Sequence, residues 1–433
     1  MHEGLSRRGF LQTSTALGAA LTLQAVAKEK KALERVRVGI VGVGNRGTAL
    51  LRALLQLPYV DVTAVCDLVE KKTAQAQVLV KKARGAKPVA YSKGERDFEN
   101  LVLREDLDAV ICATPWRWHT PVAVAAMRAG KYSATEVPAA ITLDECWELV
   151  HTSEETGMPC MMLENVCYFE NTLALLRMVR EGVFGELLHA EAGYQHDCRF
   201  LSFSDGKLTW RGEYSATLDG NLYPTHPIGP IAQWFNINRG DRFTRLVSMS
   251  TKSRGVKNQA ISNYGPEHPL AKRDYALGDV NTCLIETANG LTVTLYFDMC
   301  TPRPYDLIFR LQGTKGMHMH DQVYLEGISP KTHAYEPFDP YKEQYAHPLW
   351  TELEEESGKH GGHGGSDYIT VYEFINAVRH RTQTPQDVYD AATWSAIVPL
   401  SIASVAQKST TLDFPDFTKG KWKTRKPVSI YGA

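Results

Sequence analysis

The chain has 433 residues, of which 43% are hydrophobic and 22% charged, a composition typical of a globular protein long enough for two domains. Its 48 Lys and Arg residues nearly balance its 49 Asp and Glu residues, so nothing indicates binding to nucleic acid or to an anionic membrane. The 8 cysteines form no C-x-x-C pair, which argues against a zinc ribbon or a thioredoxin-type redox motif.

Residues 1–27 differ from the rest of the chain. Ser6 to Gln12 read SRRGFLQ, an apolar run of small residues follows, and Ala25-Val26-Ala27 closes the segment. Paired arginines, a short apolar run and an A-x-A site are typical of a twin-arginine signal peptide, and the run is too short to span a membrane. We expect a periplasmic or otherwise exported protein that meets the twin-arginine translocase. The alternative is an amphipathic N-terminal extension.

Residues 35–165 predict an NAD-binding Rossmann domain. A buried strand beginning at Val36 runs into a G-x-G-x-x-G motif, and a helical stretch follows, which is the context that this motif requires. Its three glycines, which let the backbone approach a pyrophosphate at a helix N-terminus, are Gly42, Gly44 and Gly47. A second strand ends at Asp67, where a carboxylate binds the adenosine ribose and repels a 2′-phosphate. NAD is therefore favoured over NADP; the alternative is a tight turn that binds nothing.

Strands and helices continue to alternate up to residue 165. This order predicts an α/β fold with a doubly wound parallel sheet, whose ligands lie at the carboxyl ends of the strands. The residues at those ends are Thr114 to His119, Glu136 to Pro138, and Glu164 with Asn165.

Residues 166–433 show a different pattern, in which β-rich runs follow one another without helices between them. They predict a substrate-binding α+β domain with a mainly antiparallel open sheet, in which Asn289-Gly290 forms a hairpin turn. The glycine-rich segment HGGHGGSD, residues 360–367, is interpreted as a flexible loop. Its two histidines, His360 and His363, have no further ligand at usable spacing, so no metal is expected.

The chain as a whole resembles the glucose–fructose oxidoreductase/inositol dehydrogenase superfamily. Ala113-Thr114-Pro115 with His119, and Glu136-x-Pro138, stand where that superfamily has its signatures. Two residues depart from its dehydrogenases, because Val137 replaces the usual Lys and Leu222 replaces the usual Asp four residues before His226. Further blocks resemble glycoside hydrolase family 109, whose founding activity is that of an NAD-dependent α-N-acetylgalactosaminidase: EVPAA, MLENVCY, GELLHAEAGYQHD, NLYPTHPIGP, NRGD, LVSMS, HGGHGGSD and YDAATWSAIVPLS.

This resemblance implies three overlapping sets of site residues. Those expected to act in catalysis are His226, Tyr223, Tyr168 and Glu136. Those expected to contact the substrate are Tyr194, Arg211, Tyr223, His226 and Tyr305, although a surface ion pair would explain Arg211 nearly as well. Those expected to line the NAD site are Gly42, Gly44, Asn45, Arg46, Gly47, Asp67, Trp116, His119, Glu136, Val137, Asn165 and Tyr223.

NAD-dependent glycosidases are an exception to the usual two-carboxylate mechanism. Oxidation of the C3 hydroxyl makes the C2 proton acidic, and loss of that proton expels the C1 substituent. Water addition and re-reduction complete the hydrolysis and regenerate NAD. His226 and Tyr223 are the candidates for proton transfer, and their individual roles stay open.

Two other functions remain alternatives. One is a sugar oxidoreductase with tightly bound NAD, and the other is a non-catalytic, NAD-bound sugar sensor. An exposed sheet face often pairs in the superfamily, so a homodimer is expected.

Overall fold

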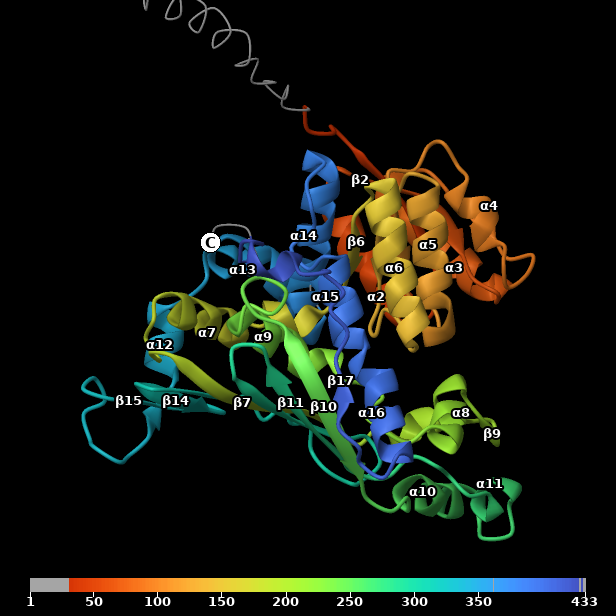
Figure 1. The fold of residues 1–433 in the computed structure, drawn as a ribbon. Coiled ribbons are helices and arrows are strands. Elements are labelled where there is room, and N and C mark those ends of the chain that lie inside the picture. Colours follow the sequence, from red (N-terminus) through yellow and green to blue (C-terminus); the bar gives the residue numbers. More distant parts are fainter. Residues whose placement is uncertain (1–30, 361, 428–429, 431–433) are drawn as a thin grey trace, which may run out of the picture.

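The computed structural model describes residues 31–360, 362–427 and 430. It contains two large sheets with helices between them (Figure 1). The predicted signal peptide, residues 1–27, lies outside the described residues.

The first sheet has six strands in the order β3-β2-β1-β4-β5-β6, and every neighbouring pair is parallel. Its strands are β1 (Val36–Val41), β2 (Val60–Cys66), β3 (Val89–Tyr91), β4 (Ala109–Cys112), β5 (Tyr132–Thr135) and β6 (Cys160–Met162). The helices that connect them are α2 (Asn45–Gln56), α3 (Glu70–Arg84), α4 (Phe98–Val102), α5 (His119–Arg128) and α6 (Leu143–Thr156). This is the strand order of a Rossmann fold, so the prediction is confirmed.

Local signals in the sequence explain these elements. Val36, Val38 and Ile40 are fully buried, since a central parallel strand is covered on both faces. Helix α6 begins at a capping box formed by Thr142 and Glu145, and ends at Gly157 in the left-handed conformation.

The second sheet has nine strands in the order β16-β15-β14-β13-β7-β12-β11-β10-β17. They are β7 (Leu187–Gln195), β10 (Phe243–Ser250), β11 (Asn281–Thr287), β12 (Thr292–Asp298), β13 (Arg310–Gly313), β14 (Gly316–Met319), β15 (Gln322–Leu325), β16 (Glu336–Pro337) and β17 (Leu412–Asp413). Neighbouring pairs are antiparallel except β7 with β12, which confirms the predicted class. A separate two-stranded ribbon joins β8 (Phe203–Ser204) to β9 (Lys207–Leu208).

Some helices of the second half of the chain pack on the second sheet, and others pack on the first sheet and its helices. They are α7 (Glu170–Arg180), α8 (Trp210–Thr217), α9 (Thr225–Trp234), α10 (Gly255–Tyr264), α11 (Pro269–Lys272), α12 (Asp339–Gln344), α13 (Pro348–His360), α14 (Ser366–His380), α15 (Val388–Ser395) and α16 (Ile397–Ala406). Helix α9 packs on β7 and α16 packs on β10, whereas α14 packs on α2 and α15 on β6 (Figure 1). The C-terminal helices therefore bring late residues to the edge of the first sheet.

The stretch Val388–Ala406 is the one part of the described chain long and apolar enough to cross a membrane. In this fold 72% of that stretch is buried, and it forms α15 and α16 between the two sheets. Its apolar character is explained by its place in the core.

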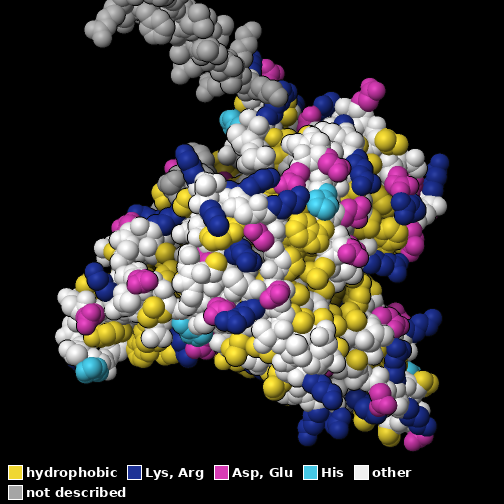
Figure 2. Space-filling view, viewed as in Figure 1, with side chains coloured by type: hydrophobic (Ala, Val, Ile, Leu, Met, Phe, Trp, Pro, Cys, Tyr) yellow, Lys and Arg dark blue, Asp and Glu magenta, His cyan; other side chains and the backbone are white. Residues whose placement is uncertain are grey.

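The surface carries charges of both signs. On the face drawn in Figure 2, Lys and Arg side chains are interspersed with Asp and Glu, in keeping with the net charge of −1. Leu188, Met249 and Leu284 on the second sheet are exposed. The expected homodimer stays a prediction.

Burial of His318 on β14 generates a prediction about stability. Its imidazole is fully buried, and this burial outweighs two backbone groups that favour the charged form, lowering the pKa of His318 to about 4. An unfolded histidine has a pKa of about 6.5, so the stabilisation is complete above that pH and is lost as the pH falls towards 4. Between pH 6.5 and 4 the free energy of unfolding should fall by about 3 kcal/mol less in His318→Leu than in the wild type, because Leu cannot take up a proton. Urea unfolding of both proteins at several pH values measures it, and identical pH dependence would contradict it.

Candidate active site

A cavity of about 640 Å³ lies at the carboxyl ends of the first sheet's strands, where residues of the second part of the chain meet them. This volume suits a small-molecule site. It brings together most of the predicted residues: Gly42, Gly44, Asn45, Arg46, Asp67, Trp116, His119, Glu136, Val137, Asn165, Tyr194, Arg211, Tyr223 and His226. Gly47, Tyr168 and Tyr305 do not line the cavity itself.

Two glycines of the motif, Gly42 and Gly47, form a cradle in which no side chain would fit. A Cβ at Gly47 would lie 1.8 Å from the carbonyl oxygen of Gly42, and one at Gly42 would lie 2.6 Å from that of Ala113. Helix α2 then starts without a side-chain cap and without an acidic residue in its first turn. Its first N–H groups and the helix dipole are thus suited to a pyrophosphate.

Asp67 is held at the end of β2 by the backbone. Its carboxylate accepts hydrogen bonds from the N–H of Val43 at 3.0 Å and the N–H of Val69 at 2.9 Å. Two bonds leave lone pairs on both oxygens, which can accept from the hydroxyls of an adenosine ribose. Together with the glycine cradle, Asp67 makes this end of the cavity fit NAD.

Arg46 lies at the centre of an ionic cluster in the cavity wall. Its Nε is 2.6 Å from Oε1 of Glu136, and its Nη1 is 2.6 Å from Oδ2 of Asp367 at the start of α14. Asp367 also accepts from Nδ2 of Asn165 at 2.8 Å and pairs with Nδ1 of His363 at 2.9 Å. Burial raises the pKa of Asp367, but the bond from His363 and the charge of Arg46 outweigh it and hold that pKa far below its usual range.

His226 lies in the first turns of α9 and faces a carboxylate from the first sheet. Its Nδ1 is 2.6 Å from Oε1 of Glu164, which is fully buried just after β6. The same oxygen accepts the N–H of Val166 at 3.0 Å. The ring of His226 also lies against Tyr223 and Tyr194, with centroid distances of 4.9 and 5.2 Å. His226 thus joins the two parts of the fold.

Three tyrosines, Tyr194, Tyr223 and Tyr305, lie close to one another and to His226. Burial raises the pKa of Tyr223 to about 12 even though Arg211 lowers it, and burial also raises the pKa of Tyr194. Tyr305 is 47% exposed, and its ring centroid lies 6.0 Å from that of Tyr194. It therefore borders the cavity rather than lining it. At neutral pH all three are neutral phenols that can donate or accept hydrogen bonds.

Arg211 on α8 is packed among aromatic rings. Its guanidinium carbon lies 4.5 Å from the centroid of Trp210, 5.1 Å from that of Trp116 and 5.5 Å from that of Tyr223. No acidic side chain among the described residues forms an ion pair with it, so the surface ion pair considered from the sequence is not found. A cation held by ring faces at the cavity wall can donate hydrogen bonds to a ligand oxygen.

Two family models divide the chain between them. Residues 36–164 match the NAD-binding Rossmann fold of an oxidoreductase family, and residues 168–424 match the C-terminal domain of glycosyl hydrolase 109. The chain belongs to glycosyl hydrolase family 109. The family assignment made from the sequence blocks is confirmed.

Relatives of this family match the whole chain. A Tannerella forsythia protein named alpha-N-acetylgalactosaminidase is 43% identical over 464 aligned positions, covering 98% of this chain and 99% of that one. A glycosyl hydrolase family 109 protein of Solibacter usitatus is also 43% identical, with coverage of 98% and 99%. The family and its Rossmann domain make this chain an NAD-dependent glycoside hydrolase.

Solved structures show the same fold at lower identity. Levoglucosan dehydrogenase in complex with NADH matches with a TM-score of 0.67 at 21% identity, covering 88% of this chain and 100% of that one. An inositol dehydrogenase homologue from Azotobacter vinelandii, complexed with NADH and myo-inositol, matches at 0.66 and 17% identity, over 89% and 99% of the two chains.

In this family 109 member, two predicted residues occupy unexpected surroundings. Tyr168 is fully buried in the core, and its hydroxyl has no hydrogen-bond partner among the described residues, so its position gives no support to a catalytic role. His119 lines the cavity, but its ring nitrogens lie 2.7 and 2.8 Å from the carbonyl oxygens of Pro138 and Thr114. A neutral imidazole has one N–H, so it donates to one of these two carbonyls, and the ring of His119 lies between two loops of the cofactor wall.

Two residues of the site had no predicted role. Glu164 was expected only to lie at the cofactor edge of the sheet, and Asp367 only to end a glycine-rich loop. In the structure that loop is short, since α13 extends to His360 and α14 begins at Ser366. Neither residue has a local motif, because their partners His226 and Arg46 are 62 and 321 positions away in the chain.

The Arg46 cluster predicts a strong effect of Asp367→Asn. Asp367 is 2% exposed, and removing its charge leaves Arg46 and His363 without that partner, which should lower the free energy of unfolding by about 3 kcal/mol. Urea unfolding measures this loss. Asp274→Asn is the matched control, because Asp274 pairs with Lys257 while its side chain is 99% exposed, so its effect should stay below about 1 kcal/mol. Equal losses in the two variants would contradict the prediction.

Proposed function

We propose that this protein hydrolyses α-N-acetylgalactosaminides, or closely related α-glycosides, through transient oxidation at C3. The observation that carries the proposal is the pairing of His226 with Glu164 beside a cavity that fits NAD. The carboxylates that line this cavity are Asp67, Glu95 and Glu136. Asp67 holds the loop at the nucleotide end, while Glu95 pairs with Arg117 and Glu136 with Arg46. The described lining therefore lacks two facing carboxylates of the usual glycosidase kind.

His226 is suited to take the first proton. Its Nδ1 is engaged by Glu164, so Nε2 is the ring nitrogen available for the C3 hydroxyl proton. Bound NAD would accept the hydride from C3 and later return it. Glu164 then lies beside the imidazolium, and its negative charge stabilises the protonated ring.

We assign the C2 proton to Tyr223, which acts as a phenolate after its own hydroxyl proton has passed to solvent. A phenol becomes a useful base when a nearby cation lowers its pKa, and Arg211 has this effect on Tyr223. Arg211 also lowers the pKa of Tyr194, but its guanidinium lies over the ring of Tyr223, 5.5 Å from the ring centroid. Loss of the C2 proton breaks the C1–O bond, and the leaving oxygen takes a proton from solvent. Water then adds its oxygen to C1 and a proton to C2.

Arg211 supports the choice of an N-acetylated sugar. Its guanidinium has no acidic partner among the described residues and is flanked by the rings of Trp116, Trp210 and Tyr223. An amide carbonyl oxygen is a good acceptor for such a cation. The relative named alpha-N-acetylgalactosaminidase supports the same substrate class.

A panel of nitrophenyl α- and β-glycosides, incubated with NAD-loaded protein in deuterated water, tests this function. We expect cleavage of the α-N-acetylgalactosaminide without added reductant, and deuterium at C2 of the released sugar. His226→Ala should lower kcat by at least about 100-fold because it removes the base. Cleavage with full retention of the C2 hydrogen would contradict the mechanism. Reduced cofactor accumulating without cleavage would indicate a sugar oxidoreductase, and binding without either reaction a sensor.

We also propose that the protein is exported through the twin-arginine route. The paired Arg7 and Arg8 support this, and so does a reaction that regenerates its cofactor in every turnover. Replacing both arginines with lysine should leave the protein in the cytoplasm, as measured by cell fractionation of the full chain with a periplasmic marker. Export of the double variant at the normal level would refute the route.

A further inference from the structure

We propose that Glu164 is a positioning residue that orients His226 and stabilises its protonated form. This inference rests on the proposed function, in which His226 takes the proton of the C3 hydroxyl. Sequence comparison with dehydrogenases of the superfamily points to a carboxylate four residues before this histidine, but Leu222 occupies that position and is buried in the core. In this fold the carboxylate comes instead from the end of β6.

The surroundings of Glu164 leave His226 as its principal partner. Glu164 is 0% exposed, and its Oε2 makes no hydrogen bond to the described residues. Its Oε1 accepts from the N–H of Val166 and contacts Nδ1 of His226 at 2.6 Å. A carboxylate buried in this way is costly unless a cation or a strong donor compensates it. Among the described residues, His226 is the only one whose side chain hydrogen-bonds to the Glu164 carboxylate.

Gln386 holds the backbone of Glu164 in place. Its Oε1 accepts the N–H of Glu164 at 3.1 Å, and its Nε2 donates to the carbonyl oxygen of Glu164 at 3.0 Å. Gln386 is itself fully buried, so both bonds are shielded from water. The two bonds fix the main chain from which the carboxylate extends.

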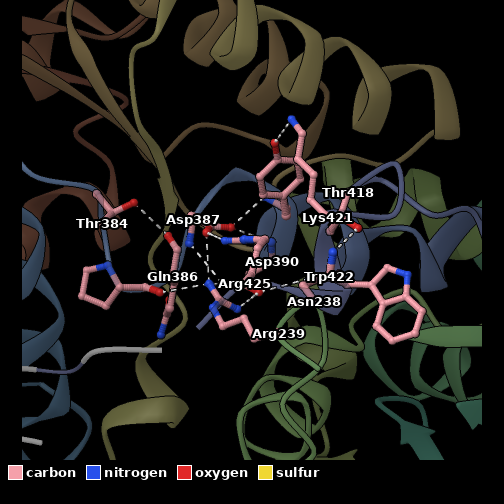
Figure 3. A network of polar contacts seen from close by, with 12 residues as sticks. Asn238, Arg239, Thr384, Gln386, Asp387, Asp390, Thr418, Lys421, Trp422 and Arg425 are labelled. Carbon is pink, nitrogen blue, oxygen red and sulfur yellow. Dashed lines mark hydrogen bonds and ion pairs between the residues drawn. The ribbon is translucent and has the colours of Figure 1, made fainter. Parts of the chain in front are cut away.

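An ionic network fixes Gln386 in turn. The next residue, Asp387, lies between Arg239 at 3.0 Å and Arg425 (Figure 3). Asp387 also caps α15 by accepting from the N–H of Tyr389 at 3.0 Å. These partners come from the loop after α9, the C-terminal segment and α15 itself. The position of Glu164 therefore depends on the loop after α9, on the segment before α15 and on the C-terminal segment.

Helix α9 admits Glu164 because of a glycine. Gly229 lies three residues after His226, on the same side of the helix. A Cβ there would lie 3.0 Å from Cγ of Glu164 and 2.8 Å from Sγ of Cys167. A larger residue would force these side chains away from the helix.

This geometry gives Glu164 two effects on His226. The contact to Nδ1 fixes the orientation of the ring and leaves Nε2, which has no hydrogen-bond partner among the described residues, for the substrate. When Nε2 takes the C3 hydroxyl proton, the O–H bond breaks, an N–H bond forms and the ring becomes positively charged. The Glu164 carboxylate at 2.6 Å stabilises that charge without itself taking the proton.

Glu164→Gln tests the proposal, because it keeps the shape of the side chain and removes its charge. We expect the single-turnover reduction of bound cofactor by a sugar, followed by near-ultraviolet absorbance, to slow by about 100-fold or more. KM, cofactor affinity and the thermal midpoint should change little. Glu154→Gln is the matched control. Glu154 lies on α6, pairs with Lys419 and Lys421, and does not line the cavity, so this variant should reduce its cofactor at the normal rate.

A spectroscopic readout makes the test independent of turnover. The short contact predicts a low-field N–H proton resonance that is absent from His226→Ala and lost or shifted in Glu164→Gln. An unchanged resonance, or a normal rate in folded, cofactor-loaded Glu164→Gln, would overturn the proposal. If Glu164→Gln does not fold, Gly229→Ala decides, with at least about 10-fold slower reduction expected and a normal rate overturning it. Wild-type protein that reduces its cofactor but cleaves no glycoside would overturn only the hydrolase function.

Discussion

The contact between Nδ1 of His226 and Oε1 of Glu164 is where the two parts of this molecule meet functionally. Glu164 belongs to the end of a parallel strand, the edge at which such a sheet binds its cofactor. His226 belongs to α9, which packs on the second sheet. Because the contact is buried and 2.6 Å long, it holds His226, the base of the proposed reaction, at the cofactor edge.

Charged side chains elsewhere in the cavity wall are also paired with an oppositely charged or polar group. Arg46 is shared by Glu136 and Asp367, and Asp367 in turn is shared by Asn165 and His363. Such pairs are costly to break in a low-dielectric interior, so the cluster holds the cofactor loop and α14 together. Arg211 is held differently, by ring faces, and keeps its donors for a ligand.

Much of the nucleotide end could be predicted, because its physics is local. A glycine, Gly47, whose Cβ would lie 1.8 Å from a carbonyl oxygen, and an aspartate at the end of the next strand are constraints within one βαβ unit. At the other end the family resemblance named individual residues, but not which of them share the cavity. Tyr168, Tyr194 and Tyr223 have the same chemistry in the sequence, but Tyr168 is enclosed in the core while the other two line the cavity.

By itself the sequence determined the family, the two fold classes, the NAD cradle and the histidine of the NLYPTHPIGP segment, because each is encoded in a contiguous pattern. Only the tertiary structure decided which carboxylate serves that histidine and which residues hold it. Glu164, His226 and Gln386 come from three segments separated by 62 and 222 positions, counted from Glu164. Contacts of that range leave no local periodicity or spacing, since they form only when α15 packs against β6 and α9 packs against the turn Asn165–Tyr168 that follows it.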